Sequence, residues 1–272
     1  PLTIVEPLVT VTKTASTTAP AAGDKITYSL NFTAEGAGSG DHFADAFDLT
    51  IGDSLGLGLL YEPGSATVNG QPLTDPLDNG GDGTNVAQTL TWSPANGIDI
   101  DIAEGATVSV TYQVRVLESV APGQTLTNNV IGRWTGLDGD QSAIERTGSG
   151  TPVVNDYFTE PAIQTLTTPL EISFDKSVIN ATTGEDPGVN AKPGDTLRYT
   201  LALTNQSIVP VNNVALVDEL AAQFAPGSLQ LLSVSDPDAD RGNSNATGGA
   251  NGTGLVDIRN LSLAERGESG AT

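Results

Sequence analysis

The chain of 272 residues contains no cysteine, no methionine and a single histidine. Without cysteine it has no disulfide, no thiolate nucleophile and no cysteine metal site. One histidine also argues against a zinc site or a Ser-His-Asp triad. A secreted domain without disulfides needs another source of robustness, such as metal ions or another covalent bond. Because position 1 is not methionine, the chain is expected to start at a processed end or inside a longer polypeptide.

Basic residues are scarce. The chain has 11 lysines and arginines against 33 aspartates and glutamates, which gives a formal net charge of −22. A nucleic-acid partner requires a basic face, so none is expected. Acidic membrane surfaces are poor partners for the same reason. No apolar run is long enough to span a bilayer, and direct membrane insertion is therefore not predicted for this segment. The negative charge suits solubility at high salt or neutralisation by divalent cations.

Glycine and proline are plentiful and spread along the chain, which favours short strands joined by turns. Apolar and polar side chains alternate over residues 26–32, 108–116 and 197–203, as in strands with one face in a core. Sustained helical periodicity is hard to find. The sequence therefore predicts an all-β fold of immunoglobulin-like, two-sheet β-sandwich domains.

An internal repeat organises the chain. The segments VTVTKTAS, AAGDKITYSLNFT, FDLTIGDSL and YEPGSATV return later as ISFDKSVI, AKPGDTLRYTLALT, VALVDELA and FAPGSLQL. The repeat predicts a first β-sandwich at residues 1–168, ending in a polar linker, and a second at residues 169–272. The second copy stops before counterparts of VTYQVRV and LTNNVIGRW. Its last strands are expected to follow in a longer chain or to be donated by a neighbour.

Three kinds of polar residue break the alternation by standing in phase with apolar neighbours. They are a repeated lysine (Lys13, Lys176), a repeated aspartate (Asp53, Asp218) and Asn128. The pattern points a lysine, an aspartate and an asparagine into one core, where an isolated charge is very costly. Two explanations involve no reaction. One is a buried lysine–aspartate salt bridge with the asparagine hydrogen-bonded nearby, and the other is edge strands from which the lysine reaches solvent.

The chemical alternative is a spontaneous isopeptide bond. Burial lowers the pKa of a lysine and raises the pKa of an aspartate. A neutral amine can then attack the asparagine side-chain carbonyl, while a protonated aspartate donates to the carbonyl oxygen and shuttles protons. Ammonia leaves and a neutral amide remains, which removes the cost of burying the lysine.

Four segments carry a family resemblance: VTVTKT, GDKITYSL, LTIGDSL and LTNNVIGRW. The order of lysine, aspartate and asparagine in them resembles fimbrial isopeptide-forming domains of bacterial pili and adhesins, and is similar to the type A domains of collagen-binding adhesins. The resemblance implies tandem collagen-adhesin-like β-sandwiches, a Lys13–Asn128 cross-link and Asp53 as its catalyst. In the second copy it implies Lys176 and Asp218 in the same roles, with the asparagine partner absent from this chain. Asn129 adjoins Asn128, although the phase favours Asn128.

Two acidic loops are candidate calcium sites, because alternating aspartates bring carboxylates toward one point and hard cations prefer oxygen ligands. The first contains Asp236, Asp238 and Asp240. It matches the EF-hand pattern only in part, since Arg241 precedes the glycine. The second, looser cluster is made of Asp75, Asp78 and Asp82. The alternative is a pair of solvated acidic turns.

These features favour a non-enzymatic structural stalk, filament or adhesin segment of a secreted bacterial cell-surface protein. The expected partners are neighbouring repeats of the same polypeptide or copies of the chain itself. The alternative is a self-assembling fibre or surface-layer subunit whose incomplete domain is completed by a neighbouring chain. An accessory domain of a secreted hydrolase is the third hypothesis, and no catalytic constellation supports it. The sequence does not identify an adhesion ligand.

Overall fold

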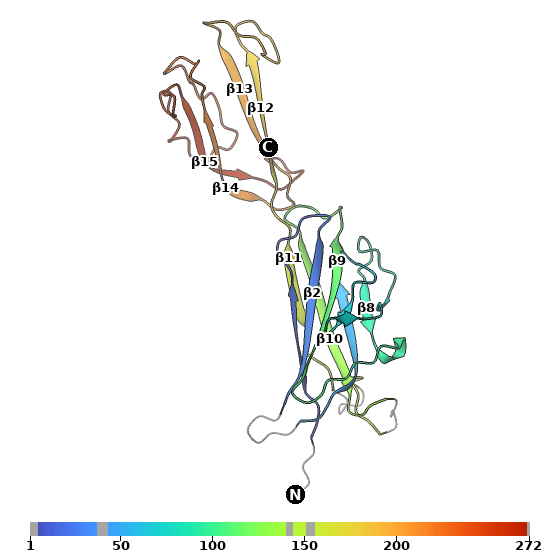
Figure 1. Cartoon of the computed structure of the whole chain (residues 1–272). Helices are drawn as coiled ribbons and strands as arrows, with labels where there is room; N and C mark the ends of the chain where they lie inside the picture. The colour runs from blue at the N-terminus through green and yellow to red at the C-terminus, as the bar shows by residue number, and fades with distance from the viewer. Residues whose placement is uncertain (1–4, 37–42, 140–143, 151–155, 271–272) are drawn as a thin grey trace. The chain divides into compact units, whose positions relative to one another are not determined.

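The computed structural model of the chain describes residues 5–36, 43–139, 144–150 and 156–270. These residues form fifteen β-strands and one short 3-10 helix. All strand pairings are antiparallel, and the predicted all-β fold is confirmed. The chain divides into two compact units (Figure 1). The first comprises Pro1–Val120 and Thr125–Pro169, and the second comprises Ala121–Gln124 and Leu170–Thr272.

One sheet of the first unit has the strand order β1-β2-β9-β5-β6, and β4 also pairs with β9. Its strands are β1 Val9–Ala15, β2 Lys25–Ala34, β4 Leu59–Tyr61, β5 Thr67–Val68, β6 Gln71–Pro72 and β9 Thr107–Val116. The two long pairings, of β2 with β1 and with β9, run without a register shift. The strands predicted at residues 26–32 and 108–116 are present as β2 and β9.

The second sheet of this unit has the order β11-β10-β3-β8-β7. Its strands are β3 Phe47–Leu55, β7 Leu77–Asp78, β8 Thr89–Trp92, β10 Thr125–Thr135 and β11 Ala162–Thr167. The helix Pro94–Asn96 follows β8. β3 is central, with β8 on one side and β10 on the other.

The core of the first unit lies between these two sheets. Tyr28 and Leu30 on β2 and Ile51 on β3 are fully buried, because alternate side chains of a strand point to the same face. The rings of Trp92 and Tyr112, on opposing sheets, have centroids 5.4 Å apart. Fully burying one apolar side chain contributes about 1.5–3 kcal/mol. Side chains at the other inward positions of these strands, polar ones included, therefore point into the same dry core.

The second unit contains two separate two-stranded sheets (Figure 1). They are formed by β12 with β13 and by β14 with β15, and the strand bounds are β12 Ile172–Asn180, β13 Leu197–Asn205, β14 Val211–Glu219 and β15 Leu255–Leu263. The strand predicted at residues 197–203 is present as β13. Four buried apolar residues form the centre of this unit: Ala239, Val256, Ile258 and Leu261.

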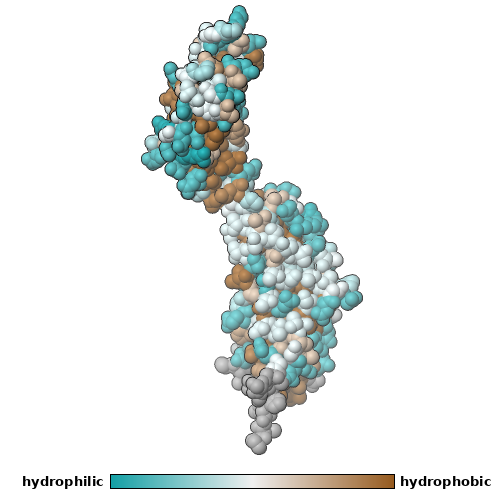
Figure 2. All heavy atoms as spheres, turned by 60° about the vertical axis from the view of Figure 1, so that its left-hand side comes forward, coloured by the Kyte–Doolittle hydropathy of each residue, from teal (hydrophilic) through white to brown (hydrophobic). Residues whose placement is uncertain are grey.

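Apolar side chains of the second unit are far more exposed than those of the first, and apolar surface is visible on it in Figure 2. Phe174 is 55% exposed and Tyr199 is 41% exposed, whereas Tyr28 of the first unit is 0% exposed. In the described part of the second unit, β13 and β14 each pair with one strand, whereas β2 and β3 each pair with two. The core-facing burial predicted for residues 197–203 is therefore only partial, because the strands that would complete it are not among those described.

The two units place equivalent residues at the same strand register. Lys13 is opposite Leu30 across β1 and β2, and Lys176 is opposite Leu201 across β12 and β13. The likeness that the sequence shows around the two lysines therefore extends to how their strands pair.

Candidate functional site

Three polar side chains from three strands meet between the two sheets of the first unit. Lys13 lies on β1, Asp53 on β3 and Asn128 on β10. The side chains of Lys13 and Asp53 have no exposed area, and Asn128 is fully buried as well. For Lys13, the hypothesis that the lysine reaches solvent is wrong. Although β1 is an edge strand, its alternation turns Lys13 inward in phase with Val9.

The lysine and the aspartate form an ion pair, with Lys13 Nζ 2.6 Å from Asp53 Oδ2. On the next strand, Val130 is directly opposite Asp53, and Asn128 lies two residues before Val130. Asn128 is therefore the diagonal neighbour of Asp53 on the same face of the sheet. Asn129 falls on the other face of β10, so the phase places Asn128 beside the pair.

The hydroxyl of Tyr112 contacts all three groups. It accepts hydrogen bonds from Lys13 Nζ at 3.3 Å and from Asn128 Nδ2 at 2.9 Å. It donates one to Asp53 Oδ2 at 2.8 Å. The sequence pattern predicts that Tyr112 faces inward but assigns it no chemical role. The role of Tyr112 could have been found from the sequence in one way. A buried tyrosine hydroxyl requires hydrogen-bond partners, and the inward-facing lysine, aspartate and asparagine provide them.

Burial favours the neutral form of the Lys13–Asp53 pair. Desolvation lowers the pKa of Lys13 from 10.5 to about 8, against the opposing charge of Asp53. Desolvation also raises the pKa of Asp53, although its contacts with Lys13, Tyr112 and Asn128 oppose this rise. The same burial raises the pKa of Tyr112 well above 10, so its hydroxyl keeps its proton. Burial therefore moves both groups in the direction of their neutral forms, an uncharged amine and a protonated carboxyl.

Two buried oxygen atoms of this cluster have no hydrogen-bond partner, Asp53 Oδ1 and Asn128 Oδ1. Buried polar atoms are nearly always partnered, so both atoms need an explanation. The Asn128 side chain lies close enough to Asp53 to influence the pKa of its carboxyl. A carboxylate can only accept, whereas a protonated Asp53 can donate to the Asn128 carbonyl. Protonation would turn one oxygen of Asp53 into a donor, the kind of partner that the Asn128 carbonyl oxygen lacks.

Lys176 and Asp218 also pair, in the second unit, but in a more open position. Lys176 Nζ lies 2.7 Å from both carboxylate oxygens of Asp218. The two side chains are 37% and 22% exposed. The prediction that Lys176 points into a dry core is therefore wrong for the described residues. Its phase along β12 is as predicted, but in the part of the unit that the structure describes no strand equivalent to β9 or β10 covers it.

The first acidic loop uses its carboxylates to cap backbone groups. Asp236 accepts hydrogen bonds from the backbone N–H groups of Asp238 and Ser262. These bonds lower the pKa of Asp236. Asp240 accepts one from the N–H group of Gly242. The alternation of aspartates therefore serves turn formation in this structure.

The second acidic cluster behaves in the same way. Asp75 accepts from the Tyr61 hydroxyl, and Asp78 accepts from a backbone N–H group two residues later. Asp82 accepts three backbone N–H bonds from residues 84–86, which lower the pKa of its carboxyl. Among the described residues, no three acidic or histidine side chains gather in a way that could hold a metal ion. Calcium binding stays a prediction.

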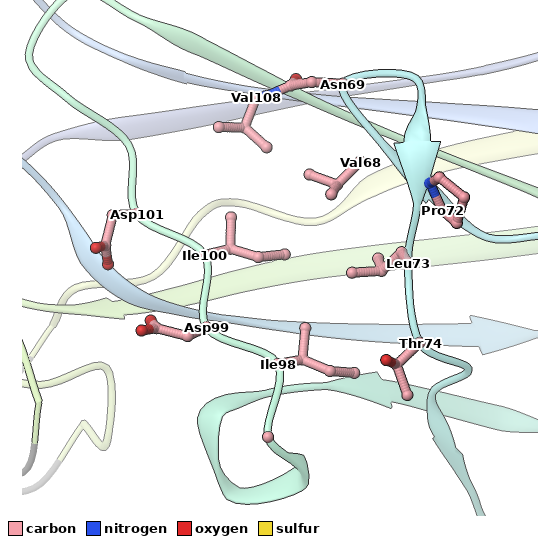
Figure 3. Close-up of a pocket in the computed structure, with 11 residues that line it drawn as sticks. Val68, Asn69, Pro72, Leu73, Thr74, Ile98, Asp99, Ile100, Asp101 and Val108 are labelled. Atoms are coloured by element: carbon pink, nitrogen blue, oxygen red, sulfur yellow. The ribbon is translucent and has the colours of Figure 1, made fainter.

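A surface hollow of about 350 Å³ lies elsewhere on the first unit. In Figure 3, Ile98 and Ile100 point toward Val68 and Leu73, while Asp99 and Asp101 of the same segment point away from them. Desolvation and three neighbouring aspartates raise the pKa of Asp99. The lining residues are apolar for the most part and include no nucleophile paired with a base.

Comparisons with known proteins identify no family. No family model and no curated protein matches the chain. Among solved structures, it is similar to a C-terminal fragment of the major pilin GBS80 of Streptococcus agalactiae, at 11% identity and a TM-score of 0.36, over 95% of this chain and 80% of that one. It is also similar to the major pilin SpaD from Corynebacterium diphtheriae, at 14% identity and a TM-score of 0.35, over 73% and 55% of the two chains.

A third similar structure is AvmM, described as catalysing macrocyclization in alchivemycin A biosynthesis, at 10% identity and a TM-score of 0.38, over 59% of this chain and 88% of that one. TM-scores this low carry no argument about function, so the function must be argued from the residues themselves. Among the described residues, no helix is both long and apolar enough to cross a membrane.

Proposed function

We propose that the first unit forms a Lys13–Asn128 isopeptide bond and that the chain is a structural stalk, filament or adhesin segment of a secreted bacterial cell-surface protein. The observation that carries this proposal is the Tyr112 hydroxyl, which contacts the amine, the carboxyl and the carboxamide inside a closed core. A salt bridge alone would not require the carboxamide to lie there.

The reaction joins the lysine amine to the asparagine carbonyl. Lys13 Nζ attacks Asn128 Cγ while Asp53 donates a proton to Asn128 Oδ1. The bond from Cγ to Nδ2 then breaks, the carbonyl re-forms, and the proton lost by the lysine nitrogen leaves with Nδ2 as ammonia. The products are one neutral amide and one ammonia, and Asp53 regains its proton. No oxidant, reductant or cofactor is needed.

Tyr112 is suited to the proton transfer in the second half of this reaction. Its oxygen lies 2.9 Å from Asn128 Nδ2, the leaving nitrogen, and 2.8 Å from Asp53 Oδ2. The hydroxyl therefore connects the acid to the atom that must be protonated before it leaves. Because the pKa of Tyr112 is raised by burial, the hydroxyl acts as a relay and not as a phenolate.

The bond has a mechanical consequence that fits a stalk. It closes a loop across the 115 positions between Lys13 and Asn128. By analogy with a disulfide of the same span, the chain-entropy model gives about 4–5 kcal/mol of stabilisation. A pull on residues outside the loop passes through the amide, so strands β2 to β9 bear none of it. The reaction consumes its own side chains and therefore occurs once per molecule, without turnover.

The alternative role, a self-assembling fibre or surface-layer subunit, is favoured by one specific observation. In the described part of the second unit, β13 and β14 each lack a neighbour on one side. Free strand edges can pair with strands of another chain.

Intact-mass spectrometry of the whole chain tests the bond. The expected mass is lower than the sequence mass by one ammonia, about 17 Da. Lys13→Met and Asn128→Leu should each restore the mass expected for their sequence. Asn129→Ala is the matched control and should keep the loss, since its side chain is on the other face of β10. An unchanged mass in the unsubstituted chain would refute the bond and leave only a buried salt bridge.

A further inference from the structure

Four Asn-Gly dipeptides lie among the described residues, at positions 69–70, 79–80, 96–97 and 251–252. In such a pair the backbone nitrogen of the glycine can attack the side-chain carbonyl of the asparagine, because glycine has no side chain that obstructs the approach. The attack closes a five-membered imide ring and releases ammonia. Since the four pairs share this chemistry, their surroundings decide which of them reacts first.

In three of the four pairs, hydrogen bonds hold both nitrogen atoms that take part in the reaction. The glycine N–H, whose nitrogen is the nucleophile, donates to a nearby oxygen at 2.5 Å for Gly80, 2.8 Å for Gly97 and 3.1 Å for Gly252. The side-chain Nδ2 of the asparagine before each glycine, which is the leaving group, donates to a backbone carbonyl oxygen at 2.9–3.1 Å. These bonds must break before the carboxamide can turn toward the glycine nitrogen, and ring closure is slowed accordingly.

The pair formed by Asn69 and Gly70 differs from the other three. Both residues are exposed. Over the part of the chain that the structure describes, neither the N–H of Gly70 nor Nδ2 of Asn69 has a hydrogen-bond partner. On the side of Gly70 where a Cβ would lie, no atom comes within 4 Å. The nucleophile and the leaving group are therefore both free here.

The one hydrogen bond of the Asn69 side chain favours the reaction. Asn69 Oδ1 accepts from the backbone N–H of Ser109 at 2.9 Å, and Figure 3 shows Asn69 beside Val108, the residue before Ser109. Attack on Cγ places negative charge on Oδ1, and a donor already directed at that oxygen stabilises the charge. Asn79 Oδ1 also accepts a backbone bond, from Thr89. The free nucleophile, and not this bond alone, therefore distinguishes Asn69.

The hairpin around Asn69 is short enough to open locally. Asn69 and Gly70 are the two central residues between β5 and β6, where Val68 is opposite Gln71. Their φ angles of 47° and 78° are those of a type I′ turn. β5 and β6 have two residues each, and so short a strand pair is marginally stable. The turn can therefore leave its resting geometry at a low cost in free energy.

We infer that Asn69 is a site of spontaneous deamidation and that it converts before the other three Asn-Gly pairs. Gly70 N gives up its proton and bonds to Asn69 Cγ, the bond from Cγ to Nδ2 breaks, and Nδ2 takes a proton and leaves as ammonia. Water then adds to one of the two imide carbonyls and opens the ring to aspartate or isoaspartate. Water is the only co-reactant, and the inference does not depend on the bond proposed for Lys13.

The product changes one wall of the surface hollow of the first unit. Asn69 lines this hollow together with Asp99 and Asp101, so an aspartate at position 69 adds a carboxylate to an acidic rim. In isoaspartate the main chain runs through the former side chain and gains one carbon, which a two-residue type I′ turn cannot accommodate. The pairing of Val68 with Gln71 should then weaken, and their backbone amides should exchange hydrogen faster.

The test incubates the full chain at mildly alkaline pH and follows the four sites by peptide mapping with mass spectrometry. Each converted site gains about 1 Da, because water enters as ammonia leaves. Asn69 should convert at least about fivefold faster than each of the other three, since two hydrogen bonds have to break at each of those. Asn69→Gly keeps a turn with positive φ and should abolish the fast conversion. Asn79→Gly is the matched control and should leave the rate at Asn69 unchanged.

The same chain in denaturant provides the reference rate. There all four pairs lose their hydrogen bonds and should convert at similar rates, so folding should slow the other three far more than Asn69. Equal rates at the four sites of the folded chain, or faster conversion at any of the other three, would overturn the inference. The Lys13–Asn128 bond lowers the mass by about 17 Da and maps to different peptides, so either proposal can fail without the other.

Discussion

The two units of this chain place a lysine and an aspartate at the same strand register, yet only the first unit buries them. In the first, β9 and β10 close the core over Lys13 and Asp53, and both side chains are fully buried. In the second, the equivalent pair is 37% and 22% exposed. The contrast teaches that the strands around such a pair decide how far it is removed from water. Desolvation is the largest cause of the pKa changes at Lys13 and Asp53.

The largest expected effect is the difference in stability loss when each of the two lysines is replaced. Lys13→Met removes the proposed cross-link and should cost the first unit about 4–5 kcal/mol. That corresponds to a fall of roughly 8–20 °C in its melting temperature for a domain of this size. Lys176→Met removes a partly exposed ion pair worth about 0–1 kcal/mol. Calorimetry of both variants measures the difference, and equal shifts would mean that no cross-link stabilises the first unit.

Tyr112 provides the next comparison, because its hydroxyl has no counterpart among the described residues of the second unit. Tyr112→Phe keeps the ring and removes the hydrogen bonds to Lys13, Asp53 and Asn128. Cross-linking should slow on the order of 100-fold, as for loss of a general acid. The readout is the linked fraction against time after cell-free synthesis.

Tyr61→Phe is the matched control for this experiment. The Tyr61 ring packs against Tyr112, but its hydroxyl bonds to Asp75, away from the lysine. This control should cross-link at the parent rate. If both variants slow equally, the effect comes from packing of the aromatic cluster and not from the Tyr112 hydroxyl.

A smaller effect is expected from pH. The reactive form, a neutral amine with a protonated acid, contains as many protons as the ion pair, so the rate should not change while the pair holds one proton. Above about pH 8, the lowered pKa of Lys13, the pair loses that proton and Asp53 can no longer donate. The rate should then fall, up to about tenfold per pH unit. A rate that keeps rising to pH 10 would show that only the neutral amine is required.

The smallest expected effect concerns calcium. If Asp236, Asp238 and Asp240 bind it, millimolar calcium should raise the melting temperature of the second unit by a few degrees, and a chelator should reverse the rise. Asp236→Asn tests the site, because it removes a charge and keeps an oxygen that can accept the bond from Ser262. Identical melting with and without chelator would leave these residues as turn formers only.

The all-β fold and the inward direction of the polar residues of the first site were predictable from the sequence. Alternation along a strand depends only on residues that are close together in the sequence. Alternation alone placed Lys13, Asp53 and Asn128 on inward faces, and all three are buried. The contact of Tyr112 with them was not predictable in the same way. It depends on which strands pair and which sheets face each other, and that information lies in residues far apart in the sequence.

The exposure of Lys176 and the hydrogen bonds of the acidic loops could not be predicted from the sequence, for different reasons, and calcium binding itself stays a prediction. Burial of Lys176 needs strands on either side, and periodicity within β12 carries no information about them. For the loops, spacing alone suggested that carboxylates converge. Aspartates in turns instead bond to their own backbone N–H groups, as Asp82 does with three of them.

The position of Asn128 on a strand late in the first unit would make the proposed amide a record of folding history. The carboxamide and the Lys13 amine reach the same Tyr112 hydroxyl only after both sheets have assembled, so an unfolded or misregistered chain would not acquire the proposed bond. Heating or denaturant would later separate the strands but would not return the ammonia that the proposed reaction releases. The mass of a denatured molecule would therefore still report whether it had once been native, and the lighter fraction of a preparation would count every chain that had ever folded.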